Sequence, residues 1–160
     1  MDGNAVNVRP MTPADAGEVL TVQLAAFVRE GQLYGDVDLP PLVESVGQVR
    51  ADLEHGLGLV ALVGTRVVGS VRVRVEGSSL HIGRLAVAPD HQGRGVGALL
   101  LARAEQLTGA TEALLFTGHR SESNLRLYAR AGYVELRRVV VDDRVTLVHL
   151  RKQLAWRVDR

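Results

Sequence analysis

Apolar residues recur along the chain with two different spacings. Short runs rich in valine, isoleucine and leucine predict β-strands, and longer segments with an apolar residue every three to four positions predict amphipathic helices. The predicted order is β-α-α-β-β-β-α-β-α-β-β. The strands are expected at 6–9, 57–63, 67–75, 79–87, 113–117, 133–141 and 145–150, and the helices at 12–28, 42–53, 98–107 and 123–131.

Turn and cap residues set the limits of these elements. Residues 12–15, TPAD, are typical of a helix start because a capping threonine precedes a proline and an acidic residue. Residues 31–41, GQLYGDVDLPP, carry two glycines and two prolines and are expected to end the first helix. Residues 64–66 favour a hairpin, and Asp142-Asp143 predicts a turn. A length of 160 residues without repeats favours one domain over 1–160, with a core at about 6–150.

The most informative stretch is 80–97, LHIGRLAVAPDHQGRGVG, which leads directly into the predicted helix ALLLARAEQL. An apolar strand here enters a loop with glycines at 93, 95 and 97, immediately before a helix. Backbone N–H groups at such a helix start are unpaired, and they converge on one anion at the positive end of the helix dipole. The stretch therefore predicts a phosphate-binding loop.

Three kinds of phosphate-binding loop use glycines at similar spacings. A P-loop needs Lys and Ser or Thr after its last glycine, but Ala98 and Leu99 follow Gly97. A dinucleotide fingerprint fits Gly93, Gly95 and Ala98, but it needs an acidic residue after the next strand, and Glu112 precedes that strand. The remaining pattern, Gln92-x-x-Gly95-x-Gly97 after RLAVAP, resembles the central motif of the GCN5-related N-acetyltransferase (GNAT) superfamily.

A second block, SESNLRLYARAGY at 121–133, is similar to the C-terminal signature of the same superfamily. Asn124 and Tyr128 are four positions apart, so on a helix they share one face and address one ligand. Gly132 suits the residue after a helix C-terminus, and Tyr133 begins a strand pattern. An alternative interpretation makes Tyr128 a core residue and Asn124 part of a cap.

The resemblance covers nearly the whole chain and implies an α+β fold. Three layers, α/β/α, are expected, with a mixed and mostly antiparallel sheet in which strands 79–87 and 113–117 form a splayed parallel pair. It also implies acetyl-CoA as cofactor, with the diphosphate on the glycine-rich loop and the pantetheine along strand 79–87. Tyr128 is expected to protonate the departing thiolate. The expected cofactor-binding residues are Leu85, Ala86, Val87, Gln92, Gly93, Arg94, Gly95, Val96, Gly97, Asn124 and Tyr128.

Composition narrows the function classes. The chain is 46% hydrophobic and 23% charged with a net charge of +1, and it has no basic stripe of the kind that binds nucleic acid. No apolar run approaches the roughly 20 residues that span a bilayer, and residues 1–10 lack a signal-peptide core, so a cytoplasmic protein without a membrane partner is expected. The absence of cysteine excludes thiolate metal sites and an acyl-cysteine intermediate, no metal site is expected, and the acetyl group is expected to move directly.

The base and the acceptor are less sharply defined by the sequence. His119, just beyond strand 113–117, is the predicted general base, with His81 and Glu76 as alternatives, and a surface role stays open for all three. Residues 30–54 carry six acids against Arg50, so we expect a cationic small-molecule or peptide amine as acceptor, although a solvated acidic face is equally compatible. The predicted function is N-acetylation by direct attack in a ternary complex. A non-catalytic acyl-CoA sensor is the alternative, and a homodimer paired through strand edges is possible. The six acids are Glu30, Asp36, Asp38, Glu44, Asp52 and Glu54.

Overall fold

A seven-stranded mixed sheet runs through residues 5–155, the part of the chain that the computed structural model describes. The strand order is β1-β2-β3-β4-β5-β7-β6. Every neighbouring pair is antiparallel except β4 and β5, which are parallel, so the predicted α+β fold with one parallel pair is confirmed. The strands are β1 (Val6–Pro10), β2 (Leu57–Val63), β3 (Arg66–Glu76), β4 (Ser79–Val87), β5 (Glu112–Gly118), β6 (Val134–Val140) and β7 (Thr146–Gln153).

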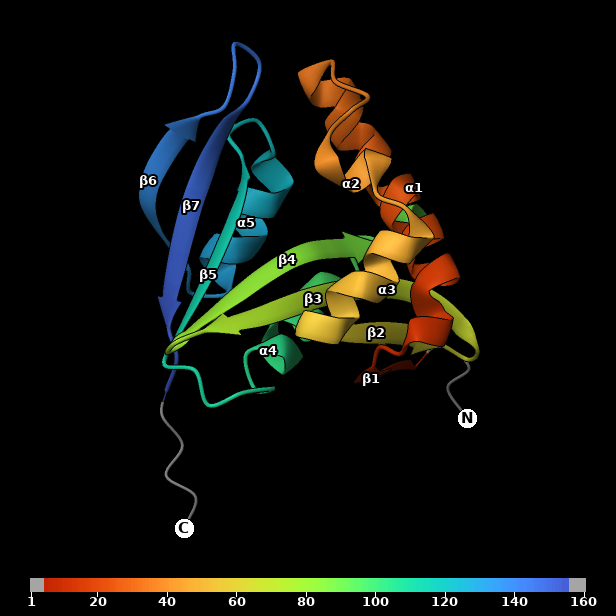
Figure 1. The fold of residues 1–160 in the computed structure, drawn as a ribbon. Coiled ribbons are helices and arrows are strands. Elements are labelled where there is room, and N and C mark those ends of the chain that lie inside the picture. Colours follow the sequence, from red (N-terminus) through yellow and green to blue (C-terminus); the bar gives the residue numbers. More distant parts are fainter. Residues whose placement is uncertain (1–4, 156–160) are drawn as a thin grey trace.

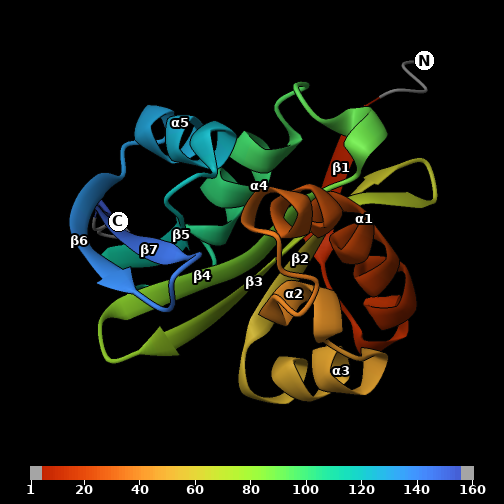
Figure 2. The same cartoon turned by 90° about the horizontal axis from the view of Figure 1, so that it is seen from above.

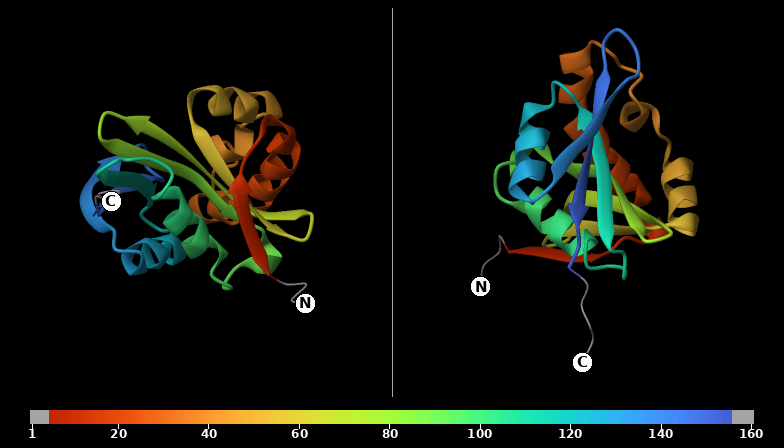
Figure 3. Two further views of the ribbon diagram at one scale, coloured as in Figure 1. Left: turned by 90° about the horizontal axis from the view of Figure 1, so that it is seen from below. Right: turned by 90° about the vertical axis from the view of Figure 1, so that its left-hand side faces the viewer.

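Helices cover both faces of this sheet (Figures 2 and 3). Helices α1 (Ala16–Tyr34) and α3 (Val46–His55) lie on one face, and α4 (Val96–Ala104) and α5 (Glu122–Arg130) lie on the other. Because α1 and α4 both pack on β3, residues 67–73 of that strand are buried on both faces, and four of these seven residues are valine. The short elements are α2 (Pro40–Val43) and the 3-10 turns η1 (Pro13–Asp15) and η2 (Pro89–His91).

Strands β4 and β5 separate soon after they begin. They pair only at three positions, from Ser79 opposite Glu112 to His81 opposite Leu114, and then diverge into a V that is plain in Figure 1. A bulge in β4 contributes to the divergence, because its register against β3 shifts between Ala86 and Gly83. Arg84, inside the bulge, has φ of +53° and is the only non-glycine residue of 5–155 with positive φ. The backbone of β4 after the bulge therefore has no β5 partner.

The first helix is longer than its sequence predicts. The sequence places its end near Val28, at the glycine- and proline-containing segment, but α1 continues to Tyr34 and ends at Gly35, where φ is +60°. Gly31 does not break the helix. It is buried, and the position its Cβ would occupy is only 2.8 Å from Leu42 Cδ1 and 3.1 Å from the Asp36 carbonyl oxygen, so the glycine serves close packing.

The helix predicted at 42–53 is two helices. Glu44 is extended between them, and Ser45 caps α3 by accepting a hydrogen bond from the Gln48 backbone N–H at 3.1 Å. The helix expected from Ala98 starts two residues earlier, at Val96, with Gly95 as its N-cap. The other predicted elements agree with the structure to within a few residues at each end.

Strand β6 is one of the two edge strands of the sheet, opposite β1, and is exposed along its whole length. Val134, Val139 and Val140 are among its exposed apolar residues. This edge is where a second copy would pair in the homodimer that the sequence suggests, and the dimer stays a prediction.

Candidate functional site

The glycine-rich loop lies between β4 and α4, as the sequence predicts. Gly93 and Gly95 have φ of +75° and +84°, a conformation that glycine adopts without strain. The loop is anchored at its start, where Gln92 Nε2 donates a hydrogen bond to the Val87 carbonyl oxygen at 3.1 Å. Because Gly95 has no side chain to cap α4, the first N–H groups of the helix have no side-chain partner at the N-cap. The loop thus has the backbone donors that an anion requires.

These donors open into a cavity of about 640 Å³ that runs along β4 and between α1, α4 and α5. Arg94 is exposed, and neither it nor Tyr128 is among the lining residues. The predicted cofactor-binding residues that line the cavity are Leu85, Ala86, Val87, Gln92, Gly93, Gly95, Val96, Gly97 and Asn124.

The cavity lining is positively charged on balance. Arg29, Arg126 and Arg130 line it, and none of them forms an ion pair with a carboxylate of the lining. Lys152 also lines it but is paired with Glu105 at 2.7 Å. A polyanion such as a nucleotide diphosphate is therefore favoured over a neutral ligand.

Asn124 and Tyr128 both lie on helix α5, as predicted, but only Asn124 lines the cavity. Asn124 Nδ2 donates to Thr117 Oγ1 of β5 at 3.3 Å, which orients the amide beside the cavity. Tyr128 is 7% exposed, and its hydroxyl makes no hydrogen bond to any residue of 5–155. Burial, with the nearby Glu30 carboxylate, raises the pKa of Tyr128, so the hydroxyl stays protonated at neutral pH.

Comparison with known proteins decides what this arrangement is. The family model of the acetyltransferase (GNAT) domain matches residues 43–154, well over half of the chain. The chain belongs to the GNAT acetyltransferase family. The family resemblance seen in the sequence is confirmed. The cofactor that it implies is confirmed as well, because GNAT domains use acetyl-CoA as the acetyl donor.

Solved GNAT structures share the fold at low sequence identity. PaiA N-acetyltransferase from Thermoplasma acidophilum, in complex with coenzyme A, has a TM-score of 0.75 at 15% identity, over 94% of this chain and 99% of that one. The ribosomal-protein-S18-alanine N-acetyltransferase from Escherichia coli has a TM-score of 0.77 at 15% identity, over 97% of each chain. YncA from Salmonella typhimurium, with acetyl-CoA, has a TM-score of 0.75 at 18% identity, over 95% of each chain.

One curated relative is similar in sequence over part of its length. The UPF0157 protein YqkA of Bacillus subtilis (strain 168) is 29% identical over 119 residues, which are 74% of this chain and 34% of YqkA. The GNAT chain described here therefore spans about a third of that relative.

The histidines and the glutamate expected as bases do not line the cavity of this GNAT domain. His119 follows β5, and its Nδ1 lies 3.1 Å from both the backbone nitrogen and the carbonyl oxygen of Thr146, with its ring 5.9 Å from that of Tyr34. His81 Nε2 lies 3.4 Å from Glu76 Oε2, near the end of β4 that still pairs with β5. The structure thus separates His81 and Glu76 from the open part of the V.

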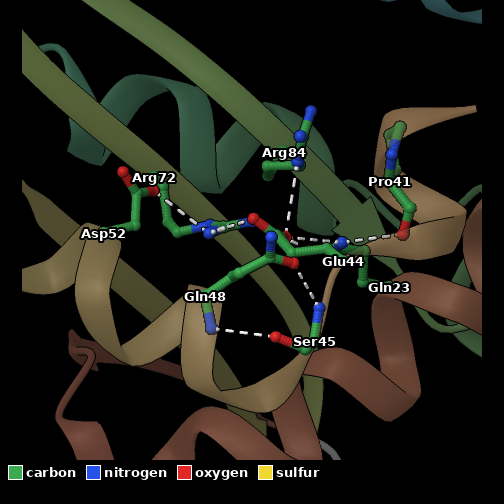
Figure 4. A network of polar contacts seen from close by, with 8 residues as sticks. All are labelled: Gln23, Pro41, Glu44, Ser45, Gln48, Asp52, Arg72 and Arg84. Atoms are coloured by element: carbon green, nitrogen blue, oxygen red, sulfur yellow. Dashed lines mark hydrogen bonds and ion pairs between the residues drawn. The ribbon is translucent and has the colours of Figure 1, made fainter.

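The acidic segment 30–54 is less negative than its sequence suggests, because arginines from β3 and β4 reach into it (Figure 4). Arg72, 4% exposed, binds Glu44 through both of its terminal nitrogens and Asp52 at 3.0 Å. Arg84 Nε lies 3.5 Å from the same Glu44 carboxylate. Burial opposes ionisation of Glu44, but the hydrogen bonds from Arg72 and Gln23 outweigh it and hold the pKa of Glu44 below its ordinary value. Two of the six acids are therefore paired with arginine: Glu44, whose side chain is 12% exposed, and Asp52, whose side chain is 47% exposed.

Glu30 is the acid of that segment that lines the cavity. The sequence lists it among the six but does not single it out. Its inward position follows from the extension of α1 beyond Val28, because the same face of the helix then carries Gln23, Glu30 and the buried Tyr34. A helix ending at Val28 would have left Glu30 in a loop.

Among residues 5–155, no three side chains of the His, Cys, Asp or Glu types gather closely enough to bind a metal ion. No helix within the described chain is long and apolar enough to cross a membrane.

Proposed function

We propose that this GNAT domain transfers the acetyl group of acetyl-CoA to a primary amine, by direct attack in a ternary complex. The observation that carries the proposal is that one cavity joins the glycine-rich loop, the unpaired stretch of β4 and the start of α5. Two of the structurally similar proteins are N-acetyltransferases by name, which supports an amine acceptor. A cysteine-free chain also favours direct transfer over an acyl-cysteine intermediate.

Each part of the cavity has a separate role in holding the donor. The backbone N–H groups of residues 92–97 bind the diphosphate, and the excess of arginine adds long-range attraction. The backbone of Leu85, Ala86 and Val87 faces the open V and has no β5 partner, so it can pair with the pantetheine like an added strand. Bound acetyl-CoA supplies an activated thioester, whose carbonyl an N–H of this stretch polarises.

Tyr128 supplies the proton for the departing sulfur. Its hydroxyl is neutral at working pH and has no competing hydrogen bond within 5–155. Because its raised pKa makes it a weaker acid than a thiol, it must regain a proton as it gives one away. We therefore assign it as a shuttle between the amine nitrogen and the sulfur.

Coenzyme A binding tests the first half of this proposal, and Gly95→Ala is the informative variant. A Cβ at Gly95 meets no protein atom within 4 Å, so it would project into open space beside the donors of the loop, and its φ of +84° adds strain. We expect calorimetry to show coenzyme A affinity weakened by about tenfold or more, equivalent to about 1.4 kcal/mol.

Gly64→Ala is the matched control, because Gly64 also has positive φ, of +59°, and free space around it, but it lies in the β2–β3 turn. It should bind coenzyme A like the unchanged protein. Equal affinities for all three proteins, or no heat with coenzyme A at all, would show that the loop is not the diphosphate site.

Turnover tests the second half. Acetyl-CoA is incubated with monoamines, diamines, amino-acid amides and lysine peptides, each beside the alcohol of the same skeleton, and free thiol is measured. We expect release of coenzyme A with at least one amine and with none of the alcohols. Tight coenzyme A binding without turnover on any amine would favour the sensor over the enzyme.

A further inference from the structure

We propose that Glu30 is the general base of this domain and that its carboxylate receives the acceptor as an ammonium ion. This inference rests on the proposed N-acetyltransferase function and deepens it. It replaces His119 with a carboxylate on α1, a helix from which the sequence suggests no base.

A chain of hydrogen bonds holds the Glu30 carboxylate in place. The Arg120 backbone N–H donates to Tyr34 Oη at 3.0 Å, and the hydroxyls of Tyr34 and Ser121 lie 2.8 Å apart. Ser121 Oγ in turn donates to Glu30 Oε2 at 2.5 Å. An ionised carboxylate only accepts, so the Ser121 proton must point to Glu30 and the Tyr34 proton must point to Ser121. The hydrogen bonds therefore all point from Arg120 toward Glu30, and the last one ends on its carboxylate.

The other carboxylate oxygen is left for the substrate. Glu30 Oε1 makes no hydrogen bond with residues 5–155, and no cation of that range lies within ion-pair distance of the carboxylate. Glu30 also lines the cavity that contains the glycine-rich loop, whereas His119 does not. A fixed carboxylate with one free oxygen, facing the cofactor cavity, suits an ammonium group.

Glu30 lies near Tyr128, the proposed proton donor, and lines the cofactor cavity. Its charge contributes, after burial, to the raised pKa of Tyr128, so the two groups act on the same small volume. The other titratable groups around this volume are Tyr34 on the same helix and His119 beyond Tyr34. The charged and titratable groups that line the cavity with Glu30 are Arg29, His91, Glu105, Arg126, Arg130 and Lys152. Ser121 lies in the loop between β5 and α5. Its hydrogen bond to Glu30 therefore ties α1 to that loop and fixes the position of the carboxylate.

The chemical step balances with these two residues. Glu30 Oε1 takes one proton from the ammonium, which frees the nitrogen lone pair. That pair forms the C–N bond to the acetyl carbon, the C–S bond breaks, and its electron pair leaves on sulfur. Tyr128 gives its proton to the sulfur and takes the second proton from the nitrogen, and Glu30 releases the first proton to solvent.

Glu30→Gln separates the base from the structural contact, because the amide oxygen can still accept the Ser121 hydrogen bond. With the panel amine of highest turnover, we expect kcat/KM at pH 7 to fall by about 10²–10³-fold. The unchanged enzyme binds the abundant ammonium form, whereas the variant must wait for neutral amine, whose fraction rises about tenfold per pH unit below a pKa of ~10.4. The ratio of the two kcat/KM values should therefore shrink by about tenfold for each pH unit from 7 to 9.

Binding supplies a readout independent of turnover. The Glu30→Gln protein should bind coenzyme A with unchanged affinity, and in that complex it should bind the same amine more weakly by calorimetry. Glu18→Gln changes an exposed carboxylate of the same helix α1 that does not line the cavity, so it is the matched control and should leave both affinities and kcat/KM unchanged.

The outcomes distinguish the inference from the function on which it rests. No turnover of any amine by the unchanged protein ends the proposed function. If the unchanged protein turns over an amine but Glu30→Gln has the same kcat/KM, or a kcat/KM reduced by the same factor at every pH, Glu30 is not the base. It is then only a structural contact. If Glu30→Gln does not fold, Glu30→Asp is used instead, because it retains a carboxylate. Its kcat/KM should be reduced but should keep the pH dependence of the unchanged enzyme. A tenfold rise of kcat/KM per pH unit in Glu30→Asp would contradict the inference.

Discussion

Replacing Arg72 by methionine is expected to lower the free energy of unfolding by about 3–5 kcal/mol, because it leaves the largely buried carboxylate of Glu44 without its main partner. The Glu44 side chain is 12% exposed and that of Arg72 is 4% exposed. Methionine matches much of the arginine volume, so the loss reports the charge rather than a cavity. Urea unfolding, with the slope checked for two-state behaviour, measures the change.

Arg138→Met is the control, because it removes an arginine–glutamate ion pair that is exposed to solvent. Arg138 binds Glu135 at 2.7 Å, but the two side chains are 53% and 45% exposed. Surface ion pairs contribute only about 0–1 kcal/mol, so this variant should be nearly neutral. A loss from Arg72→Met no larger than that from Arg138→Met would mean that the buried network adds nothing to stability.

The loss from Arg72→Met should also depend on pH. Hydrogen bonds from Arg72 and Gln23 overcome burial and lower the pKa of Glu44 in the folded protein. A carboxyl with a lowered pKa contributes stability that is present above its unfolded pKa and is lost as pH falls through the folded value. The difference between Arg72→Met and the unchanged protein should therefore narrow as the pH is lowered into that range.

The same network shows why part of the site was not predictable from the sequence. The pattern of strands, the glycine-rich loop and the helix that carries Asn124 and Tyr128 are local, since each depends on residues a few positions apart, and the structure contains each of them. The shared ligand of the two side chains stays a prediction, because Asn124 lines the cavity and Tyr128 does not. The negative field expected over 30–54 is not local, because Arg72 and Arg84 enter it from strands that begin after that segment ends. Charge counted along one segment misses the partners that the fold brings in.

Helix α1 likewise depends on contacts that the sequence does not reveal, as Gly31 and Glu30 show. Glycine in a helix interior is unfavourable by about 1 kcal/mol relative to alanine, so the sequence favours a helix that ends before it. The close approach of Leu42 and the Asp36 carbonyl to Gly31 is a tertiary contact that outweighs this propensity. As a consequence Glu30 is on a helix that faces the cavity, and the candidate base becomes visible only in three dimensions.

Tyr128→Phe is expected to lower kcat by about 10²-fold or more, because it removes the proton donor for the sulfur while leaving the ring in place. The Tyr128 hydroxyl makes no hydrogen bond within 5–155, so its loss should leave the free energy of unfolding and the affinity for coenzyme A unchanged. A defect confined to kcat, with folding and cofactor binding intact, is what a proton shuttle predicts and what a core tyrosine does not.

Tyr133→Phe is the control for this change. Tyr133 packs edge-on against Tyr128 with ring centroids 6.0 Å apart, is also buried, and uses its hydroxyl to donate to Glu105 at 2.9 Å. It should lose some stability through that hydrogen bond but keep its kcat. Because burial raises the pKa of Tyr128 above its ordinary value of 10.0, the unchanged enzyme should show no loss of kcat from this group as the pH rises to 9. If Tyr128→Phe and Tyr133→Phe had equal kcat values, the proton for the sulfur would have to come from elsewhere, and the shared face of Asn124 and Tyr128 would serve binding alone.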